Sequence, residues 1–391
     1  MIHRSVGKKM GETKKVLIVS STASMIKQFN MRNIEILQEL GNEVHVAANF
    51  VEPGTITKRM AEHLQEQLQE MGVTWYQVDF GRGAGSLKSN MKAYKQIHKI
   101  IKQGYSFVHT QASLASMLTR LATHVTKTPL IYMAHGFQFY KGSSTVSWLV
   151  YYNIEKFLSR WTDLLITINH EDTKLAKKKF HAGEVIEVPG VGINYNKFAT
   201  PVGEDVIIKT RSELGVPQDA KLLISVGELS ARKNHRIVIE ALAKLNNPNL
   251  YYVIAGIGPL KDELNELIAQ NHLGDNVKLL GYRSDLPELY QASNAAIFPS
   301  KFEGLMVAGM EAMAAGVPLL YADVRGIRDY SEDGRTGFSF NYDDVGSVAK
   351  AMKQLANVEN RDALGISAQQ HARQFEMAEI DGQMKAIYNQ I

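Results

Sequence analysis

Short runs of β-branched and other apolar residues alternate with longer amphipathic stretches along most of the chain. The segments KVLIVS (15–20), EVHVAAN (43–49) and YSFVHT (105–110) have the length and composition of strands buried on both faces. Between them, apolar residues recur at helical spacing over residues 26–40 and 87–103. Strands that alternate with helices of this length predict a parallel α/β sheet.

The same alternation begins again in the second half of the chain, where KLLISVG, YYVIAG, NVKLLG, AAIFPS and VPLLYAD are the predicted strands. Between the two series, residues 189–205 are rich in Gly and Pro and lack helical periodicity, which predicts a linker. We therefore expect a basic, disordered lead-in (1–13), a first Rossmann-like domain (14–195), a second one (196–374) and a C-terminal helix packing back on the first domain (375–391). Parallel sheets bind ligands beyond the carboxyl ends of their strands, so the two domains are expected to face each other across a binding cleft.

Composition excludes several classes of protein. The 391 residues are 45% hydrophobic and 21% charged, which is typical of a globular protein. The chain has no cysteine, which excludes disulfides, thiolate-bound metals and thiol catalysis. No apolar run approaches the roughly 20 residues that span a bilayer. The short apolar stretch after the basic N-terminus lacks a convincing cleavage site, so a strand and a cytoplasmic location are expected rather than a signal peptide.

Charge is distributed unevenly along the chain. Residues 1–195 contain 24 Lys and Arg against 15 Asp and Glu, whereas the remainder contains 20 against 25. A basic first half suggests an anionic partner such as a membrane surface or a phosphorylated lipid, although uneven solvation accounts for it equally well. The predicted helix 87–103 presents Lys88, Lys92, Lys95, Lys99 and Lys102 either to lipid headgroups or simply to water. A nucleic-acid partner is disfavoured, because the basic residues are not interleaved with stacking aromatics.

The segment 298–318, FPSKFEGLMVAGMEAMAAGVP, carries the most chemical information. A predicted strand is followed by a polar loop and then by a helix that is expected to begin at Gly304. A helix N-terminus binds anions, because its first N–H groups lack intrahelical acceptors; here they belong to Gly304, Leu305 and Met306. Glu303 in the loop and Glu311, expected two turns into the helix, can accept hydrogen bonds from sugar hydroxyls, or can be solvated acids near a helix start.

This segment resembles the signature of glycosyltransferase family four. The match consists of Glu303-x7-Glu311, with Pro299-Ser300 before it and Gly316-Val317-Pro318 after it. Further stretches follow the family order: VGELSARKNH (226–235), AGIGP (255–259), LGYRSDLPELYQASN (280–294) and EDGRTGF (332–338). The resemblance covers the chain from about residue 14. Around AHGFQFYKG (134–142) and ITINHED (166–172) it is most similar to enzymes of bacterial exopolysaccharide or capsule synthesis.

The resemblance implies a GT-B fold and a retaining transfer of a hexosyl or N-acetylhexosaminyl group. The donor would be a nucleotide diphosphate sugar, with UDP favoured, and the acceptor a lipid-linked compound or a saccharide. No cofactor and no metal are expected, because the chain has no D-x-D pair and basic groups can neutralise the diphosphate. A cytoplasmic enzyme, peripheral at the inner face of the membrane, fits these expectations; nucleic acid is not an expected partner.

The family motif also implies roles for individual residues. Glu311 would hold the ribose, Glu303 the donor sugar, and the backbone from Gly304 to Val307 the diphosphate. Lys233, in the first helix of the second domain, would pair with the phosphates beside Arg232, although both can also be a solvated helix start. The remaining expected donor contacts are Gly227, Gly256, Gly258, Tyr282 and Arg283.

In the first domain, the resemblance implies that His135 contacts the donor sugar and stabilises charge during transfer. A lone His after an apolar strand is more often structural, so both interpretations stay open at this point. The expected acceptor-side residues are Arg82, Lys141 and Asn169.

One position departs from the family pattern. Glu228 stands where the family usually has Arg, and a carboxylate cannot clamp a diphosphate. This departure keeps open a non-catalytic, nucleotide-sugar-binding subunit of a polysaccharide assembly. A nucleotide-sugar 2-epimerase on the same fold is a second alternative. A dehydrogenase is disfavoured, because VSSTAS replaces the glycine-rich fingerprint after the first strand.

Overall fold

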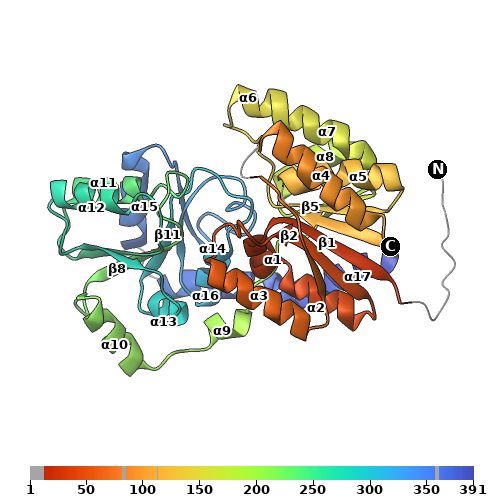
Figure 1. Cartoon of the computed structure of the whole chain (residues 1–391). Helices are drawn as coiled ribbons and strands as arrows, with labels where there is room; N and C mark the ends of the chain where they lie inside the picture. The colour runs from red at the N-terminus through yellow and green to blue at the C-terminus, as the bar shows by residue number, and fades with distance from the viewer. Residues whose placement is uncertain (1–12, 82–84, 112, 357–360) are drawn as a thin grey trace. The chain divides into compact units, whose positions relative to one another are not determined.

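The computed structural model describes residues 13–81, 85–111, 113–356 and 361–391, and it divides into two compact units (Figure 1). The first unit comprises Met1–Val191 together with Asp381–Ile391, and the second comprises Gly192–Ile380. The division at residue 191 precedes the expected boundary at 195. Residues 1–12 of the expected lead-in lie outside the described part of the chain.

The first unit is built on a parallel sheet in the order β3-β2-β1-β4-β5-β6-β7. Its strands are β1 (Lys15–Thr22), β2 (Glu43–Asn49), β3 (Thr74–Gln77), β4 (Phe107–Gln111), β5 (Leu130–Ala134), β6 (Leu164–Thr167) and β7 (Glu184–Glu187). The central strands are buried on both faces, which explains why their sequences are continuous apolar runs.

Helices cover this sheet: α1 (Ala23–Phe29), α2 (Met31–Glu39), α3 (Lys58–Glu70), α4 (Leu87–Ile101), α5 (Ser113–Thr126), α6 (Thr145–Ser147), α7 (Asn153–Leu158) and α8 (His170–Lys179). A π-helical turn, η1 (Trp148–Tyr152), joins α6 to α7, and a 3₁₀ turn, η2 (Ser159–Trp161), follows α7. The helix expected over 26–40 is two helices that meet at Asn30, whose side-chain amide donates to Met25 O at 3.0 Å.

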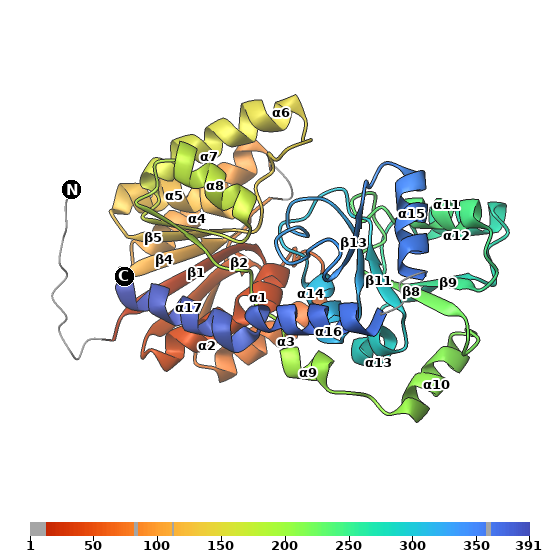
Figure 2. The same ribbon diagram turned by 180° about the vertical axis from the view of Figure 1, so that it is seen from behind.

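The C-terminal helix α17 (Met377–Gln390) returns to the first unit and lies beside α2 (Figure 2). Arg32 Nε of α2 is 2.7 Å from Asp381 Oδ2. Farther along the helix, the buried Tyr388 hydroxyl lies 2.8 Å from His109 Nδ1 on β4. The last residues of the chain therefore complete the core of the domain that begins it.

The second unit contains a parallel sheet in the order β10-β9-β8-β11-β12-β13. Its strands are β8 (Lys221–Val226), β9 (Leu250–Ala255), β10 (Val277–Gly281), β11 (Ala295–Phe298), β12 (Leu319–Ala322) and β13 (Gly337–Phe340). Its helices are α9 (Tyr195–Ala199), α10 (Glu204–Glu213), α11 (His235–Leu245), α12 (Lys261–Gln270), α13 (Leu286–Gln291), α14 (Val307–Ala314), α15 (Val345–Ala356) and α16 (Arg361–Ala372), followed by the 3₁₀ turn η3 (Arg373–Phe375).

The predicted α/β class with two parallel sheets is confirmed. Sequence reasoning missed β7 and β13, which are strands at the sheet edges, because their sequences EVIE and GFSF are not continuous apolar runs. The predicted linker 189–205 contains the short helix α9 and the start of α10, so the absence of helical periodicity was misleading there. Among the described residues, no helix combines the length and apolarity needed to cross a bilayer.

Candidate functional site

A cluster of three charged side chains lies beyond the carboxyl ends of β8 and β11, which are neighbours in the second sheet. Arg232 and Lys233 come from the turn after β8, and Glu303 comes from the loop after β11. Arg232 Nη1 is 2.5 Å from Glu303 Oε2, and Lys233 Nζ is 2.8 Å from Glu303 Oε1. Pairing of β8 with β11 thus brings together charges about 70 positions apart in sequence.

Burial makes this cluster energetically significant. Glu303 is 7% exposed and Lys233 is 9% exposed. Burial acts to raise the pKa of Glu303, but the nearby Lys233 and Arg232 outweigh it and hold that pKa below its ordinary value. An ion pair removed from water is costly to break, because the remaining charge is left uncompensated.

The turn that carries the two cations is held by backbone and side-chain contacts. Asn234 has a left-handed φ of 58°, and its side-chain amide donates to Pro299 O at 3.2 Å and to Tyr342 O at 2.9 Å. Lys301 N donates to Arg232 O at 2.9 Å, which ties the two loops together. A Cβ at Gly227 would lie 3.1 Å from Lys233 Cε, so glycine leaves room for the lysine stem.

The structure corrects the expected position of Arg232 and Lys233. Helix α11 begins at His235, so both residues lie in the preceding turn and not in the helix. His235 itself is buried, and its Nδ1 lies 3.1 Å from the hydroxyl of Tyr252 on β9. Burial lowers the pKa of His235 to about 3, which assigns it a neutral, structural role beneath the turn.

Helix α14 begins at Val307 rather than at Gly304, which corrects the expected start of the helix. Gly304 and Leu305 belong to the loop, and Met306 is the extended N-cap residue. The loop is held from the β12 side, because Arg325 Nε donates to Glu303 O at 3.1 Å. The N–H groups without intrahelical acceptors are therefore those of the first turn, beginning at Val307.

Glu311 lies just over one turn into α14, not two, because the helix starts later than expected. Its side chain is half-buried. Burial raises its pKa to about 7, and attraction to Lys197 of α9 offsets part of that rise. Hydroxyl groups that donate hydrogen bonds to such a carboxylate stabilise its charged form.

The glycines of the AGIGP stretch allow two loops to pack closely. A Cβ at Gly256 would lie 1.8 Å from Gly227 O, and one at Gly258 would lie 2.5 Å from Leu229 O. The loops after β8 and β9 pack directly on each other, with Leu229 N donating to Ile257 O at 3.1 Å. Backbone packing therefore requires glycine at these two positions, and their expected contact with the donor stays a prediction.

Two of the expected donor contacts, Tyr282 and Arg283, follow β10. Tyr282 is 79% exposed. Arg283 is paired with Asp285, with Arg283 Nε 2.7 Å from Asp285 Oδ1. Glu228, the departure from the family pattern, is exposed in the turn after β8.

His135 in the first unit belongs to a neutral hydrogen-bonded network. It follows β5, and its Nε2 lies 2.6 Å from Gln111 Oε1 at the end of β4. Gln111 Nε2 donates to Asn30 Oδ1 at 2.7 Å, and Asn30 Nδ2 donates to Ser20 Oγ on β1 at 3.3 Å. Because a carbonyl oxygen accepts from it, this arrangement assigns the ring proton to Nε2. Burial lowers the pKa of His135 to about 4, so the ring is neutral at pH 7.

Two of the three expected acceptor-side residues lie in the described part of the chain. Asn169 is fully buried and caps α8, with its Oδ1 accepting from Asp172 N at 2.9 Å, so its position is explained by helix capping rather than by an acceptor. Lys141 is exposed, and its backbone N lies 3.4 Å from Glu171 Oε1. Arg82 lies outside the described residues.

Sequence reasoning missed the groups that support the candidate site. Arg325, Asn234 and Gln111 all hold a predicted residue or its loop in place. The signal for Arg325 was present, since it follows closely on the predicted strand VPLLYAD. Gln111 and Asn30 give no such signal, because only tertiary contacts show what their buried amides bind.

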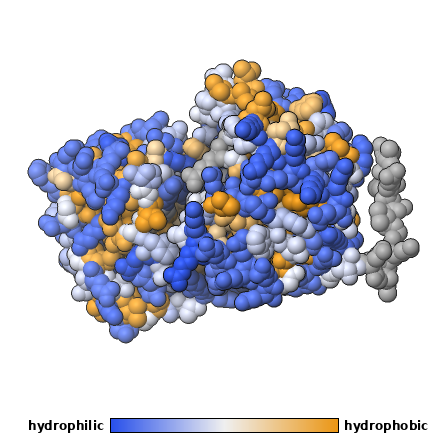
Figure 3. Space-filling model, viewed as in Figure 1, coloured by the Kyte–Doolittle hydropathy of each residue, from blue (hydrophilic) through white to orange (hydrophobic). Residues whose placement is uncertain are grey.

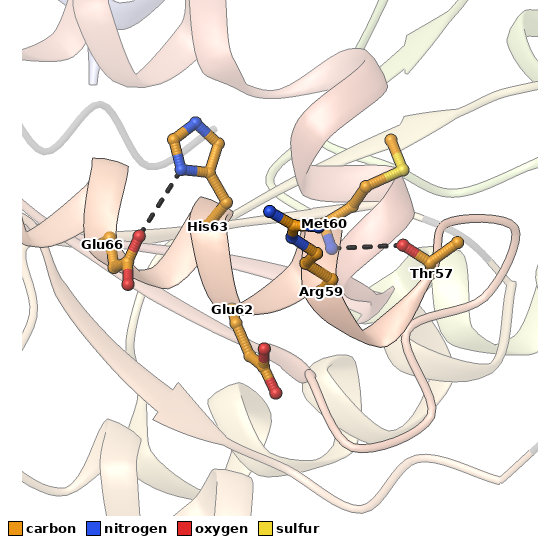
Figure 4. A pocket seen from close by; sticks show the side chains of 6 residues that line it. All are labelled: Thr57, Arg59, Met60, Glu62, His63 and Glu66. Carbon is orange, nitrogen blue, oxygen red and sulfur yellow. Dashed lines mark hydrogen bonds and ion pairs between the residues drawn. The ribbon is translucent and has the colours of Figure 1, made fainter.

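A surface hollow beside the start of α3 involves none of the predicted site residues (Figure 4). It is lined by Thr57, Arg59, Met60, Glu62, His63 and Glu66. Thr57 accepts from Met60 N at 3.2 Å as the helix cap, and His63 Nδ1 lies 3.5 Å from Glu66 Oε2. These contacts are local to one helix, so the hollow is not a candidate catalytic site.

Comparisons with known proteins decide the family. Residues 26–188 match the family model described as a glycosyl transferase 4-like domain, and residues 206–371 match the one described as glycosyl transferases group 1. The putative glycosyltransferase EpsD of Bacillus subtilis is 31% identical, with 96% of this chain and 97% of EpsD covered. The chain belongs to glycosyltransferase family four. The predicted glycosyltransferase activity is thereby confirmed.

Other members of this family extend the comparison. A UDP-Gal:alpha-D-GlcNAc-diphosphoundecaprenol alpha-1,3-galactosyltransferase of Escherichia coli is 28% identical over 70% of this chain and 72% of its own length. The crystal structure of Anabaena HepE in complex with UDP and glucose superposes with a TM-score of 0.76, at 20% identity, covering 97% of this chain and 100% of HepE. WaaG, a glycosyltransferase involved in lipopolysaccharide biosynthesis, superposes with a TM-score of 0.69 at 18% identity, over 95% of this chain and 99% of WaaG. These likenesses confirm the GT-B fold.

Proposed function

We propose that this glycosyltransferase moves a hexosyl or N-acetylhexosaminyl group from a UDP-sugar to a lipid-linked or saccharide acceptor in bacterial cell-surface or exopolysaccharide synthesis. The observation that carries the proposal is the buried cluster of Arg232, Lys233 and Glu303 beside the first turn of α14. The galactosyl transfer for which the Escherichia coli relative is named and the UDP bound to HepE support this choice of donor and acceptor.

In this proposal Glu303 neutralises the two cations until the donor binds. A diphosphate then takes its place beside Arg232 and Lys233, because it offers more negative charge than one carboxylate. Glu303 is released to accept hydrogen bonds from the donor sugar. The first-turn N–H groups of α14 supply further donors to the diphosphate.

Glu311 holds the ribose in the same proposal. Its raised pKa of about 7 means that it binds a proton in part of the free protein at neutral pH. Ribose hydroxyls that donate to the carboxylate stabilise its charged form, so nucleotide binding releases that proton.

We assign retention to a front-face reaction without a covalent enzyme intermediate. The bond between the anomeric carbon and the diphosphate oxygen breaks, and a bond to the acceptor oxygen forms on the same face. The acceptor's proton goes to the leaving diphosphate. The protein supplies positioning and electrostatic stabilisation of the leaving group through Arg232, Lys233 and α14.

His135 contributes a neutral polar group to sugar binding. Its Nε2–H is donated to Gln111, so Nδ1 is the nitrogen that accepts from a sugar hydroxyl. A metal is not required in this scheme, because two protein cations already face the diphosphate. Peripheral association with an anionic membrane completes the proposal, since a lipid-linked acceptor is displayed there.

The experiment incubates the protein with UDP-glucose, UDP-galactose or UDP-N-acetylglucosamine and an undecaprenyl-diphosphate saccharide. The expected result is UDP release together with an acceptor product of retained anomeric configuration, determined by NMR. A thermal-shift panel first selects the nucleotide sugar, because a ligand that binds the folded state raises its apparent stability. Free UDP and an epimerised sugar formed without acceptor would favour the 2-epimerase. Binding without turnover would favour the non-catalytic subunit.

A further inference from the structure

The segment α6–η1–α7 exposes large apolar side chains that a globular surface normally covers. Figure 3 shows apolar residues gathered at the top of the view, over the position of α6 and α7 in Figure 1. The exposed residues are Val146, Leu149, Val150, Tyr151, Ile154 and Phe157. Leu149 is 70% exposed. Isolated apolar residues on a surface are ordinary, but a contiguous group marks an interaction site.

Contacts on the opposite side hold this face outward. Trp148 packs on Phe139 with ring centroids 5.5 Å apart, and Tyr152 packs on Phe139 at 5.5 Å. One helical turn on, Glu155 points inward to the buried Arg120, with Oε2 2.8 Å from Nη2. The segment is therefore anchored by one side, and the apolar face on its other side is a property of the fold.

The exposed charges of the segment itself are basic. Residues 145–161 carry Lys156, Arg160 and one acidic side chain, Glu155, which is buried against Arg120. Lys156 lies over the Tyr152 ring at 5.8 Å, and Arg160 lies over the Phe157 ring at 5.5 Å. Cations that flank an exposed apolar face are the arrangement that helices at anionic bilayer surfaces use.

We propose that residues 145–161, the docking segment, insert their apolar face into the headgroup region of an anionic bilayer. Leu149, Ile154 and Phe157 enter the acyl boundary, while Lys156 and Arg160 contact lipid phosphates. The proposal deepens the proposed function, since it rests on a lipid-linked acceptor and names the surface that reaches the membrane.

The basic helix α4 is a weaker candidate for the same role. Its apolar residues Ile97, Ile100 and Ile101 are buried in the core of the first unit, so they cannot enter lipid. Lys92 is paired with Asp79, with Nζ 2.8 Å from Oδ2. The helix is an ordinary outer helix of an α/β domain whose lysines face water.

The first experiment measures co-flotation of the full chain with vesicles of phosphatidylglycerol and phosphatidylethanolamine. Leu149→Glu with Ile154→Glu should reduce binding by more than about tenfold, because charged groups replace the inserting face. The matched control is Ile208→Glu with Ile366→Glu, which alters two exposed apolar residues of the second unit and should bind as the unaltered protein does. Equal loss in the control pair would overturn the proposal.

Charge is tested separately. Lys156→Glu with Arg160→Glu should weaken binding several-fold at low salt and flatten its salt dependence, because surface attraction is screened over about 8 Å at physiological ionic strength. Lys92→Glu, Lys95→Glu and Lys99→Glu together should have a smaller effect. If the α4 change abolishes binding and the docking-segment changes do not, α4 is the membrane contact.

Tryptophan fluorescence reports the location directly. The chain has three Trp, and Trp148 and Trp161 lie in the docking segment. Vesicles should blue-shift the emission, and Trp148→Phe should remove part of that shift. An unchanged spectrum in the presence of bound vesicles would exclude insertion here. Sedimentation should show that the unaltered protein and the Leu149→Glu, Ile154→Glu variant are both monomers. If the unaltered protein is a dimer and the variant is a monomer, the apolar face is a self-association surface instead.

A transfer assay separates this proposal from the proposed function. The pair Leu149→Glu and Ile154→Glu should retain UDP binding and transfer to a short-chain, water-dispersed acceptor, but lose transfer to the same acceptor embedded in vesicles. If the unaltered protein transfers sugar to neither acceptor, the proposed function is wrong. The flotation experiment still tests whether the docking segment binds the membrane.

Discussion

The two units differ in how they hold the polar groups at their strand ends. In the second unit, the groups are charged: Glu303 sits between Arg232 and Lys233 in a buried cluster. In the first unit, they are neutral: His135 and Gln111 share a hydrogen bond of 2.6 Å, and the pKa of His135 is lowered to about 4. The second unit therefore has charged groups at its strand ends, whereas the first has neutral groups held in a fixed orientation by hydrogen bonds.

In the proposed function, this difference corresponds to different roles for the two units. Buried ions must remain compensated, so the charged cluster can only exchange one anion for another. A diphosphate is such an anion. A neutral network can present an oriented acceptor to a sugar hydroxyl without any exchange, because its internal hydrogen bonds are already satisfied. Changes in the second unit should therefore affect donor chemistry, and changes in the first unit should mainly affect stability and sugar positioning.

The largest effect is expected from Lys233→Met, which keeps the buried stem but removes the charge. We expect kcat/KM to fall by about 100- to 1,000-fold, the usual loss when one group that stabilises a leaving anion is removed. Steady-state kinetics with a UDP-sugar measure this. The control, Lys244→Met at an exposed position of α11, should leave kcat/KM unchanged. A change below threefold for Lys233→Met would exclude it from the donor site.

Glu311→Gln is expected to make stability less dependent on pH. The pKa of Glu311 is raised to about 7 by burial, from an ordinary 4.5. The contribution of Glu311 to the free energy of unfolding is therefore fully present below pH 4.5. It is lost as the pH rises through 7, because the buried carboxyl group then ionises. Glutamine stays neutral, so the variant should be more stable than the unaltered protein at pH 8 by up to about 3 kcal/mol, with no difference at pH 4.5. Urea unfolding at both pH values measures this.

The same position tests ribose binding. Glu311→Ala should weaken the binding of UDP at pH 8 by about 1 to 3 kcal/mol, the cost of charge-assisted hydrogen bonds left unmade. Isothermal titration calorimetry measures the affinity. The exposed Glu266→Ala provides the control, and an unchanged affinity in Glu311→Ala would remove the ribose assignment.

An effect of similar size, about 1 to 3 kcal/mol, but on stability rather than on UDP binding, is expected from Gln111→Leu. This change leaves His135 Nε2–H and Asn30 Oδ1 without their partner in a buried setting, so the free energy of unfolding should fall. UDP affinity should not change, because the nucleotide belongs to the second unit in our proposal. The exposed Gln138→Leu should alter neither quantity. Loss of UDP affinity in Gln111→Leu would contradict the division between the units.

The smallest effect is expected from chelation. With two protein cations at the diphosphate, transfer should persist in excess EDTA. Activity assays with and without magnesium measure this. Abolition by EDTA with rescue by magnesium or manganese would show that a metal ion, rather than Lys233 and Arg232 alone, neutralises the leaving group.

Sequence reasoning placed the right loops but not the right helix starts. The resemblance to the family points to Glu303, Arg232 and Lys233, and pairing of β8 with β11 brings them together. The sequence predicts the start of α14 at Gly304, three residues before the observed start at Val307. It also gives no sign that Arg325 from another loop donates to Glu303 O. The sequence indicates that Gly256 and Gly258 are special, but it does not show that the loop after β8 packs against them.

The sequence by itself determined the class of the fold, the two-sheet organisation and the charged loops, because apolar periodicity and strand-end residues are local signals. Only the tertiary structure decided how charges and faces are partnered. Glu303 lies between two cations, and Asn169 caps α8. Ile97 and Ile100 of α4 are buried, whereas Leu149 is exposed. The physical reason is that pairing and burial depend on what packs opposite a residue, and that neighbour is usually distant in sequence.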